Sequence, residues 1–226
     1  MRKLWRYIRN IVVGFLISSV AVALTYRFAP PPATPLMLLR IIEQAGTEKQ
    51  FRFEKDWVSI NRISPHLQLA VVAAEDQKFT DHLGFDAEAI REALQHNQKK
   101  KGKHGASTIS QQTAKNVFLW PRRSWIRKGF ESWFTILIEI LWSKKRILEV
   151  YLNVVEMGEG IYGAEAAAQH YFGKSADKIN RNEAALLAAI LPGPRKWNPA
   201  KPTKYLTDRQ QWILGQMNNL QKLNME

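Results

Sequence analysis

Cysteine is absent from this 226-residue chain. Its absence excludes a disulfide framework, a thiolate metal site and a cysteine nucleophile. Acidic residues are also scarce beside basic ones, 20 against 33, so the formal net charge is +13. Such a charge favours anionic partners: nucleic acid, anionic lipid or phosphate-bearing substrates.

Sustained period-two alternation is missing beyond residue 51, apart from a possible short strand or hairpin at residues 51–60. The pattern therefore predicts a mainly α fold. A hydrophobic content of 46%, with eight Trp and ten Phe, supplies a core. The length suits one good-sized domain with a short appendage. The five histidines show no metal-ligand spacing such as H-E-x-x-H.

The amino terminus carries an apolar segment in which no residue from Asn10 to Tyr26 is charged. Its length is near the lower limit of about 17 to 25 residues for a membrane-spanning helix. Four basic residues precede it and only Arg27 closely follows, so the positive-inside rule places the amino terminus in the cytoplasm. We expect a cytoplasmic tail at 1–9 and a single-pass membrane anchor at 10–29.

The alternative is a cleaved signal peptide, because Ala21-Val22-Ala23 resembles a cleavage site. Either way the rest of the chain lies on the periplasmic or outer side, which argues against a nucleic-acid partner. Residues 30–50 are predicted to be a proline-rich extended spacer and juxtamembrane segment that lifts the domain formed by residues 51–226 off the bilayer.

Helix start signals recur through the domain. They are Ser64-Pro65, Asp86, Thr108 with Gln111, and Asn180 with Glu183. Apolar helical stretches are predicted at 126–142 and after Ser143, and a last helix near Thr207 burying Ile213, Met217 and Leu220. The basic loop at 98–104 is either a solvated connector or a flap over the substrate.

Five ordered stretches carry most of the polar residues with chemical potential. They are Glu75-Asp76-Gln77-Lys78-Phe79 with His82, Gly84 and Asp86; Gly105 to Gln112 with Lys115-Asn116; Arg127-Lys128-Gly129-Phe130-Glu131; Lys145 to Asn153 with Gly158, Gly160, Tyr162 and Gly163; and Ala184 to Ala188 through Leu191-Pro192. In this order they resemble the signatures of the peptidoglycan glycosyltransferases, most closely the monofunctional biosynthetic transglycosylases. The resemblance spans residues 75 to about 198. It implies a lysozyme-like, two-lobed, mainly α domain preceded by one transmembrane helix.

The resemblance also implies a reaction: lipid II is polymerised into linear glycan strands with inversion, and undecaprenyl pyrophosphate is released. The attacking 4-hydroxyl is a poor nucleophile, so a carboxylate must accept its proton. The motif position gives this role to Glu75. The resemblance implies that the anchor lies in the bacterial cytoplasmic (inner) membrane. Lipid II, the growing glycan chain, membrane lipids and other cell-wall synthesis proteins are the expected partners.

A departing diphosphate needs cations or a metal ion to stabilise its charge. Expected phosphate contacts are Lys115, Arg123, Arg127 and Lys128, with Glu131 as the second catalytic carboxylate. Glu131 would orient these cations or help hold a divalent cation, Mg²⁺ or Mn²⁺; no organic cofactor is expected. The remaining expected substrate contacts are Asp76, Phe79, Ser107, Gln111 and Gln112.

Two rival functions remain open. A glycan-cleaving enzyme on a related fold would need a general acid for its leaving group and no cluster of cations. A non-catalytic membrane scaffold would tolerate loss of Glu75 and Glu131, which taken alone would read as exposed charges. The aromatic residues between Phe118 and Trp142 are expected to be about half core, with the exposed remainder dipping into the bilayer.

Two further motif matches are judged accidental. Gly158-x-Gly160-x-x-Gly163 fits the dinucleotide fingerprint, but no second strand is predicted to carry Asp177, so these glycines are expected to form a tight turn beside the glycan cleft. Ser175 to Lys178 fits the S-x-x-K of penicillin-binding transpeptidases, but no K-[ST]-G follows.

Overall fold

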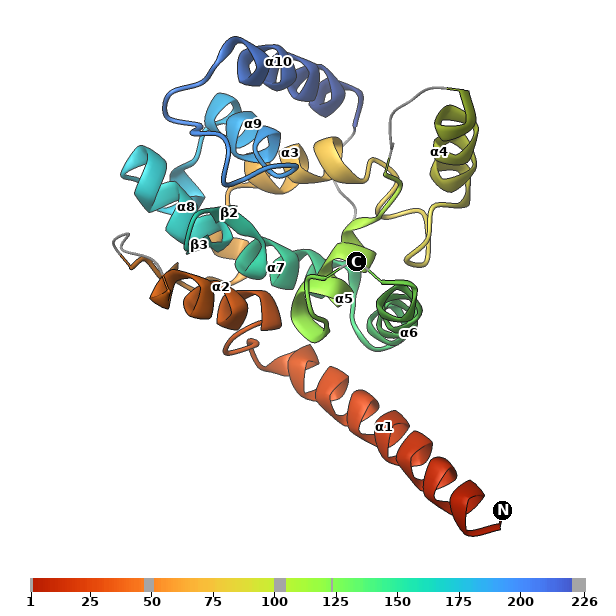
Figure 1. The fold of residues 1–226 in the computed structure, drawn as a ribbon. Helices are drawn as coiled ribbons and strands as arrows, with labels where there is room; N and C mark the ends of the chain where they lie inside the picture. Colours follow the sequence, from red (N-terminus) through yellow and green to blue (C-terminus); the bar gives the residue numbers. More distant parts are fainter. Residues whose placement is uncertain (1, 47–50, 100–104, 123, 221–226) are drawn as a thin grey trace.

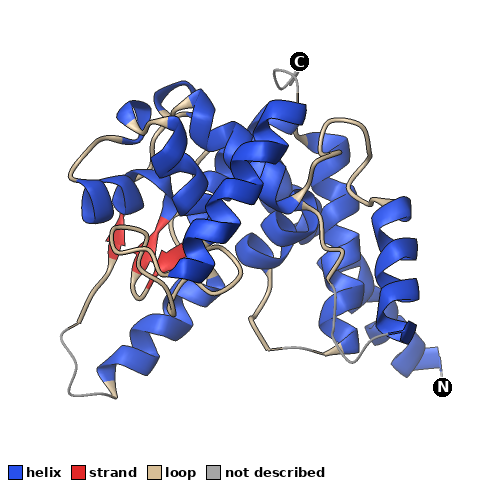
Figure 2. Ribbon diagram, turned by 90° about the horizontal axis from the view of Figure 1, so that it is seen from above, coloured by secondary structure: helices blue, strands red, loops and turns tan. Residues whose placement is uncertain are grey.

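Helices dominate the fold, and one small sheet lies at one end of it (Figures 1 and 2). The computed structural model describes residues 2–46, 51–99, 105–122 and 124–220. Within these residues the mainly α class is confirmed. The elements are α1 Arg2–Phe28, α2 Pro35–Ala45, β1 Glu54–Lys55, a 3₁₀ turn Ile60–Arg62, α3 Pro65–Glu75, α4 Ala87–Lys99, α5 Ile109–Phe118, α6 Trp125–Leu141, α7 Lys144–Val154, β2 Glu156–Gly158, β3 Ile161–Tyr162, α8 Gly163–Phe172, a 3₁₀ turn Ala176–Lys178, α9 Arg181–Ala189 and α10 Lys204–Asn219.

The predicted helix caps are present. Ser64 caps α3, and capping boxes open α5 and α9. Asp86 accepts hydrogen bonds from the first backbone amides of α4. The last helix begins three residues earlier than predicted, because Thr203 rather than Thr207 provides the cap. It buries Ile213 and Met217 as expected, whereas Leu220 is only half-buried.

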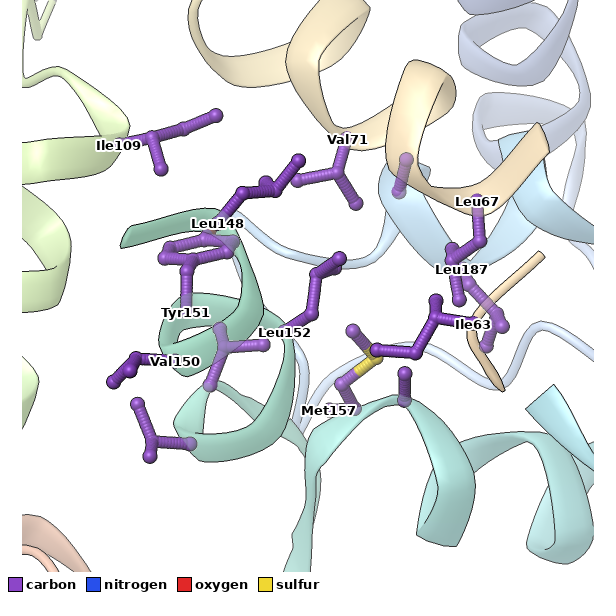
Figure 3. Packing of buried hydrophobic residues seen from close by; sticks show 14 of the residues in the cluster. Ile63, Leu67, Val71, Ile109, Leu148, Val150, Tyr151, Leu152, Met157 and Leu187 are labelled. Carbon is purple, nitrogen blue, oxygen red and sulfur yellow. The ribbon is translucent and has the colours of Figure 1, made fainter. Parts of the chain in front are cut away.

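Two groups of helices form the two lobes. In one lobe α3 packs against α9 and α10, and in the other α5 packs against α6 and α7 (Figure 1). Figure 3 shows the apolar contact between them, where Val71 of α3 approaches Leu148 of α7. This core holds the carboxyl end of α3 beside α5, so the ends of both helices meet at one place.

The small sheet has the order β1-β3-β2, with β1 parallel and β2 antiparallel to β3. The predicted strand at 51–60 is therefore present, but its partner lies about a hundred residues away. Gly163 has φ +84°, and a Cβ there would lie 2.7 Å from the carbonyl oxygen of Asn153. The glycines at 158, 160 and 163 thus allow a tight turn and a close approach of its backbone to neighbouring segments. Asp177 lies in a 3₁₀ turn and not on a strand, which removes the dinucleotide reading.

The expected place of this glycine turn is wrong. A Cβ on Gly160 would meet the backbone of Arg52, and the turn does not line the cleft beside Glu75 described below. Its packing partner is the segment before β1, in the part of the domain that carries the sheet.

Helix α1 is long and apolar enough to cross a membrane, and only 11% of its most apolar 18-residue stretch is buried in the structure. It begins at Arg2, well before the predicted span. The extended spacer is short, because α2 starts at Pro35 with Thr34 as its cap. The expectation that a spacer lifts the domain away from the anchor is wrong, since α1 packs directly on α6.

Candidate active site

Glu75 is the last residue of α3 and faces α5. The Nε2 of Gln112 donates a hydrogen bond to the Glu75 Oε2 over 2.7 Å. The hydroxyl of Tyr151, on α7, donates to the Oε1 of Gln112 over 3.2 Å. Three helices therefore fix the orientation of one carboxylate. Gln112, expected as a substrate contact, here holds Glu75 in place.

The environment makes the Glu75 carboxylate more basic than usual. Burial raises its pKa, while the hydrogen bond from Gln112 and the positive charges of Arg209 and Lys115 partly oppose this, and the charge of Asp76 adds to it. A position at the carboxyl end of a helix also disfavours negative charge. A carboxylate with a raised pKa is a better proton acceptor at neutral pH than a solvated one.

Asp76 joins the end of α3 to the start of α5. Its Oδ2 accepts a hydrogen bond from the backbone amide of Ile109 over 3.0 Å, and its Oδ1 lies 2.9 Å from the Nε2 of His82. Asp76 is only 7% exposed. Both oxygens are thus engaged within the protein, and Asp76 supports the position of Glu75. His82 thereby helps to hold the Asp76 carboxylate in place.

Glu131 lies on the inner face of α6 with two cations from the preceding turn. The Nη1 of Arg127 lies 2.6 Å from its Oε2, and the Nζ of Lys128 lies 2.5 Å from its Oε1. Glu131 is 3% exposed and Arg127 is buried, whereas Lys128 is 42% exposed along its side chain. We call these three residues the α6 charge cluster. Its net charge is +1, and its exposed member is a lysine.

Lys115 connects the two carboxylates electrostatically. Burial lowers its pKa, the charges of Glu131 and Glu75 raise it, and those of Arg127 and Lys128 lower it. One ammonium group therefore lies in the field of both acids. Among the described residues it forms no ion pair within 4 Å, so its charge remains available to an anionic ligand.

A cleft of about 490 Å³ borders Glu75. Its walls come from the end of α3, from α4, from residues 105–108 and from Trp212 of α10. The charged side chains that line it are Glu75, Asp76, Asp86, Glu88 and Glu92, with Lys78, which is ion-paired to Glu88. This acidic cleft does not extend to Glu131. The site therefore has an acidic side and, across Gln112 and Lys115, a basic side.

The other predicted contacts divide into three groups. Ser107 is exposed and lines the acidic cleft. Phe79 has no exposed surface and Gln111 is buried with its side chain closing the α5 capping box, so neither is open to a substrate, contrary to expectation. Arg123 and most of the basic loop, residues 100–104, lie outside the described residues.

The donor set does not fit a divalent cation held by protein alone. The described residues contain no group of three or more His, Asp or Glu side chains suited to a metal ion. Both oxygens of Glu131 already face cations.

Sequence reasoning missed four residues of this site. Tyr151 belongs to the fourth motif, but nothing in its spacing indicates a bond to Gln112. Arg209 and Trp212 come from α10, far from any motif. Glu139 accepts hydrogen bonds from Ser110 and Lys144 and braces the start of α5. Each contact depends on how the helices pack and leaves no local signal.

Comparison with known proteins identifies the family of this chain. Residues 42–218 match the transglycosylase family. A biosynthetic peptidoglycan transglycosylase of Bacteroides thetaiotaomicron is 51% identical over 98% of this chain and 90% of its own length. Proteins of the same description in Ectopseudomonas mendocina (51% identical; 97% of this chain, 91% of its own) and Shewanella oneidensis (48%; 100% and 96%) are similar. The chain belongs to the transglycosylase family, whose members of this kind polymerise glycan chains in cell-wall synthesis.

Proposed function

We propose that this chain polymerises lipid II by inverting glycosyl transfer, with Glu75 as the base and the α6 charge cluster receiving the diphosphate. The observation that carries the proposal is the polarity of the site. The carboxylate of Glu75, with its raised pKa, borders the acidic cleft on one side. Lys115 and the α6 charge cluster lie on the other side of this carboxylate.

The base side suits the acceptor sugar. The attacking 4-hydroxyl is neutral, so the carboxylates of the acidic cleft do not repel it. The Glu75 carboxylate takes the hydroxyl proton as the bond to the anomeric carbon forms. Gln112 donates its hydrogen bond to the Oε2 of Glu75 and not to the Oε1. The Oε1 is therefore available to accept the proton.

The cationic side suits the leaving group. Cleavage of the anomeric carbon–oxygen bond leaves the electron pair on undecaprenyl pyrophosphate, which departs without protonation. Lys115 and Lys128 stabilise that charge, and Glu131 holds Lys128 and Arg127 in place through its two ion pairs. The acidic cleft would repel a diphosphate, so the substrate has one favourable orientation.

The proposed setting is the bacterial cytoplasmic membrane. With α1 as a single-pass anchor and its basic start in the cytoplasm, the domain faces the outer side, where it meets lipid II, the growing glycan chain and membrane lipids. In this proposal a divalent cation binds through the diphosphate oxygens of the substrate, because the described residues offer no group of three protein ligands for it. Other wall-synthesis proteins remain proposed partners.

The decisive test is polymerisation of labelled lipid II by the full-length Glu75→Gln variant. Gln112 can still donate to the new amide oxygen, so the fold is retained while the proton acceptor is lost. We expect the rate to fall by about 10²- to 10⁴-fold. Glu54→Gln, at the edge of the sheet, is the matched control and should retain wild-type activity.

Wild-type activity in Glu75→Gln would overturn the mechanism. The rival cleavage function predicts a different product: muropeptides released from sacculi in the absence of lipid II. A product analysis by mass therefore separates the two enzymes in the same experiment.

A further inference from the structure

One face of α1 is buried although most of the helix is exposed. Ala23 is fully buried and Ser19 is 4% exposed, while their neighbours Ser18 and Ala21 are exposed. With Phe15 and Tyr26 they form a line at intervals of four, four and three residues, which is one face of a helix. We call these four residues the α1 stripe.

The stripe contacts the helices that carry the active site. The Phe15 ring lies edge-on to Phe130 of α6, with centroids 5.3 Å apart. The Tyr26 ring lies 6.1 Å from Phe118 at the end of α5. The same two helices carry Lys115 and the α6 charge cluster.

Polar contacts fix the depth of α1 against the domain. The indole of Trp133 donates to the Ser19 hydroxyl over 3.2 Å, and that of Trp142 donates to the Ala23 carbonyl over 2.8 Å. Arg146 of α7 donates to the carbonyls of Tyr26 and Ala29 at the end of α1, each over 2.8 Å. A sliding α1 would leave these donors unpaired, which is costly where water is excluded.

The stripe occupies the carboxyl-terminal half of α1, which is the outer-leaflet half of a helix that enters from the cytoplasm. The α6 residues that contact it therefore lie below the membrane surface. The outward side of α6 agrees with this, because Ile126, Ile136 and Ile140 are 72%, 45% and 73% exposed. Exposed apolar side chains continuous with a membrane helix suit acyl chains.

We propose that the α1 stripe docks the anchor on the catalytic domain within the outer leaflet, so that α6 faces acyl chains and the α6 charge cluster meets lipid-bound diphosphate at a fixed depth. The claim about depth rests on the proposed function, whereas the docking itself does not. Ser19, Ala23, Trp133, Trp142 and Arg146 are then positioning residues for a lipid-bound substrate.

Matched substitutions on one helix separate docking from anchoring. Ala23→Phe wedges the stripe apart, and Ala21→Phe adds the same bulk to the exposed side. Both keep α1 apolar, so both variants should insert into membranes. Ser19→Leu and Ser18→Leu form a second pair, in which only the first removes the acceptor of Trp133.

The first measurement needs no turnover. Because the chain lacks cysteine, spin labels can be placed at Val12→Cys and Lys145→Cys in the full-length protein in lipid nanodiscs. We expect a narrow distribution of distances for the parent and for Ala21→Phe, and a broad one for Ala23→Phe. A broad distribution in the parent would show that α1 is a free tether and would overturn the proposal.

The second measurement compares polymerisation in liposomes with polymerisation in detergent micelles. If the α1 stripe sets the depth of the domain in the membrane, the polymerisation rate of Ala23→Phe should fall about tenfold in liposomes. It should fall little in micelles, where the substrate can adjust its position. A loss of equal size in both media, or the same ratio for Ala21→Phe, would reject a positioning role. If the parent itself fails to polymerise lipid II, the proposed function is wrong while the distance measurement still decides the docking.

Discussion

The hydrogen bond from Gln112 to Glu75 is the contact that most directly sets how basic the carboxylate is. It stabilises the ionised form and so lowers the pKa that burial has raised. Gln112→Leu removes it, and we expect the pKa of Glu75 to rise further. Because the base must be ionised, the acidic limb of kcat/KM should move to higher pH.

The measurement is a pH–rate profile of polymerisation for Gln112→Leu and the parent. Gln169→Leu is the control, because the side chain of this exposed glutamine donates to Glu165 on its own helix; we expect the acidic limb to stay at the parent's pH. An acidic limb that stays unchanged in Gln112→Leu would mean that another group titrates in the profile.

The raised pKa of Glu75 also has a cost in stability. Its pKa is higher in the folded than in the unfolded chain, so the contribution of Glu75 to stability is fully present below the unfolded pKa and is lost as pH rises through the folded pKa. Glu75→Gln cannot ionise. We therefore expect it to raise Tm near neutral pH, and to change Tm little in acid where both side chains are neutral.

Thermal unfolding of parent and Glu75→Gln at acid and neutral pH tests this sign. A variant that is destabilised at neutral pH would show that the ionised Glu75 is stabilised by Arg209 and Lys115 more than burial penalises it. The measurement is independent of catalysis.

Among the elements, the helix ends were predictable and the contacts between helices were not. Ser64, Thr108 and Asn180 act on backbone amides within three residues, so short patterns reveal them. The pairing of β1 with β3 joins residues far apart in sequence, and so does the electrostatic interaction of Arg209 with Glu75. Periodicity carries no information about such partners.

The site shows the same division. The motifs identified Glu75, Lys115, Arg127, Lys128 and Glu131, which lie together as expected. They also led to Phe79 and Gln111 being assigned to the substrate, although both are buried supports. A motif marks residues that a site requires, and only packing tells which of them face the ligand.

The glycine turn before α8 gives an element-scale prediction. Gly163 and Gly173 both have positive φ, +84° and +63°, but only Gly163 lacks room for a Cβ. Gly173→Ala should cost about 1–2 kcal/mol from backbone strain alone. Gly163→Ala adds a clash with the Asn153 backbone and should cost clearly more, measured as the free energy of unfolding in urea.

Equal losses for the two variants would mean that the Asn153 contact relaxes freely. Retained activity in folded Gly163→Ala protein would support the structural role of this turn, since it does not line the acidic cleft.

At the scale of the whole molecule, the net charge of +13 attracts anionic lipid and substrate alike, but it does not by itself place a diphosphate. In the proposed mechanism the local arrangement places it, because an acidic cleft and the α6 charge cluster lie on either side of Lys115. Attraction by the net charge of the whole molecule and binding by the α6 charge cluster predict different changes in diphosphate affinity when one positive charge is removed.

Inorganic pyrophosphate distinguishes them as a competitor of polymerisation. Lys128→Gln and Lys145→Gln lower the net charge equally, but only Lys128 belongs to the α6 charge cluster. If the cluster binds the diphosphate, Lys128→Gln should weaken inhibition about tenfold, or roughly 1.4 kcal/mol, and Lys145→Gln should change it little. Equal weakening in both variants would assign the attraction to the field of the whole molecule, and the cluster would lose its role as the receiver of the leaving group.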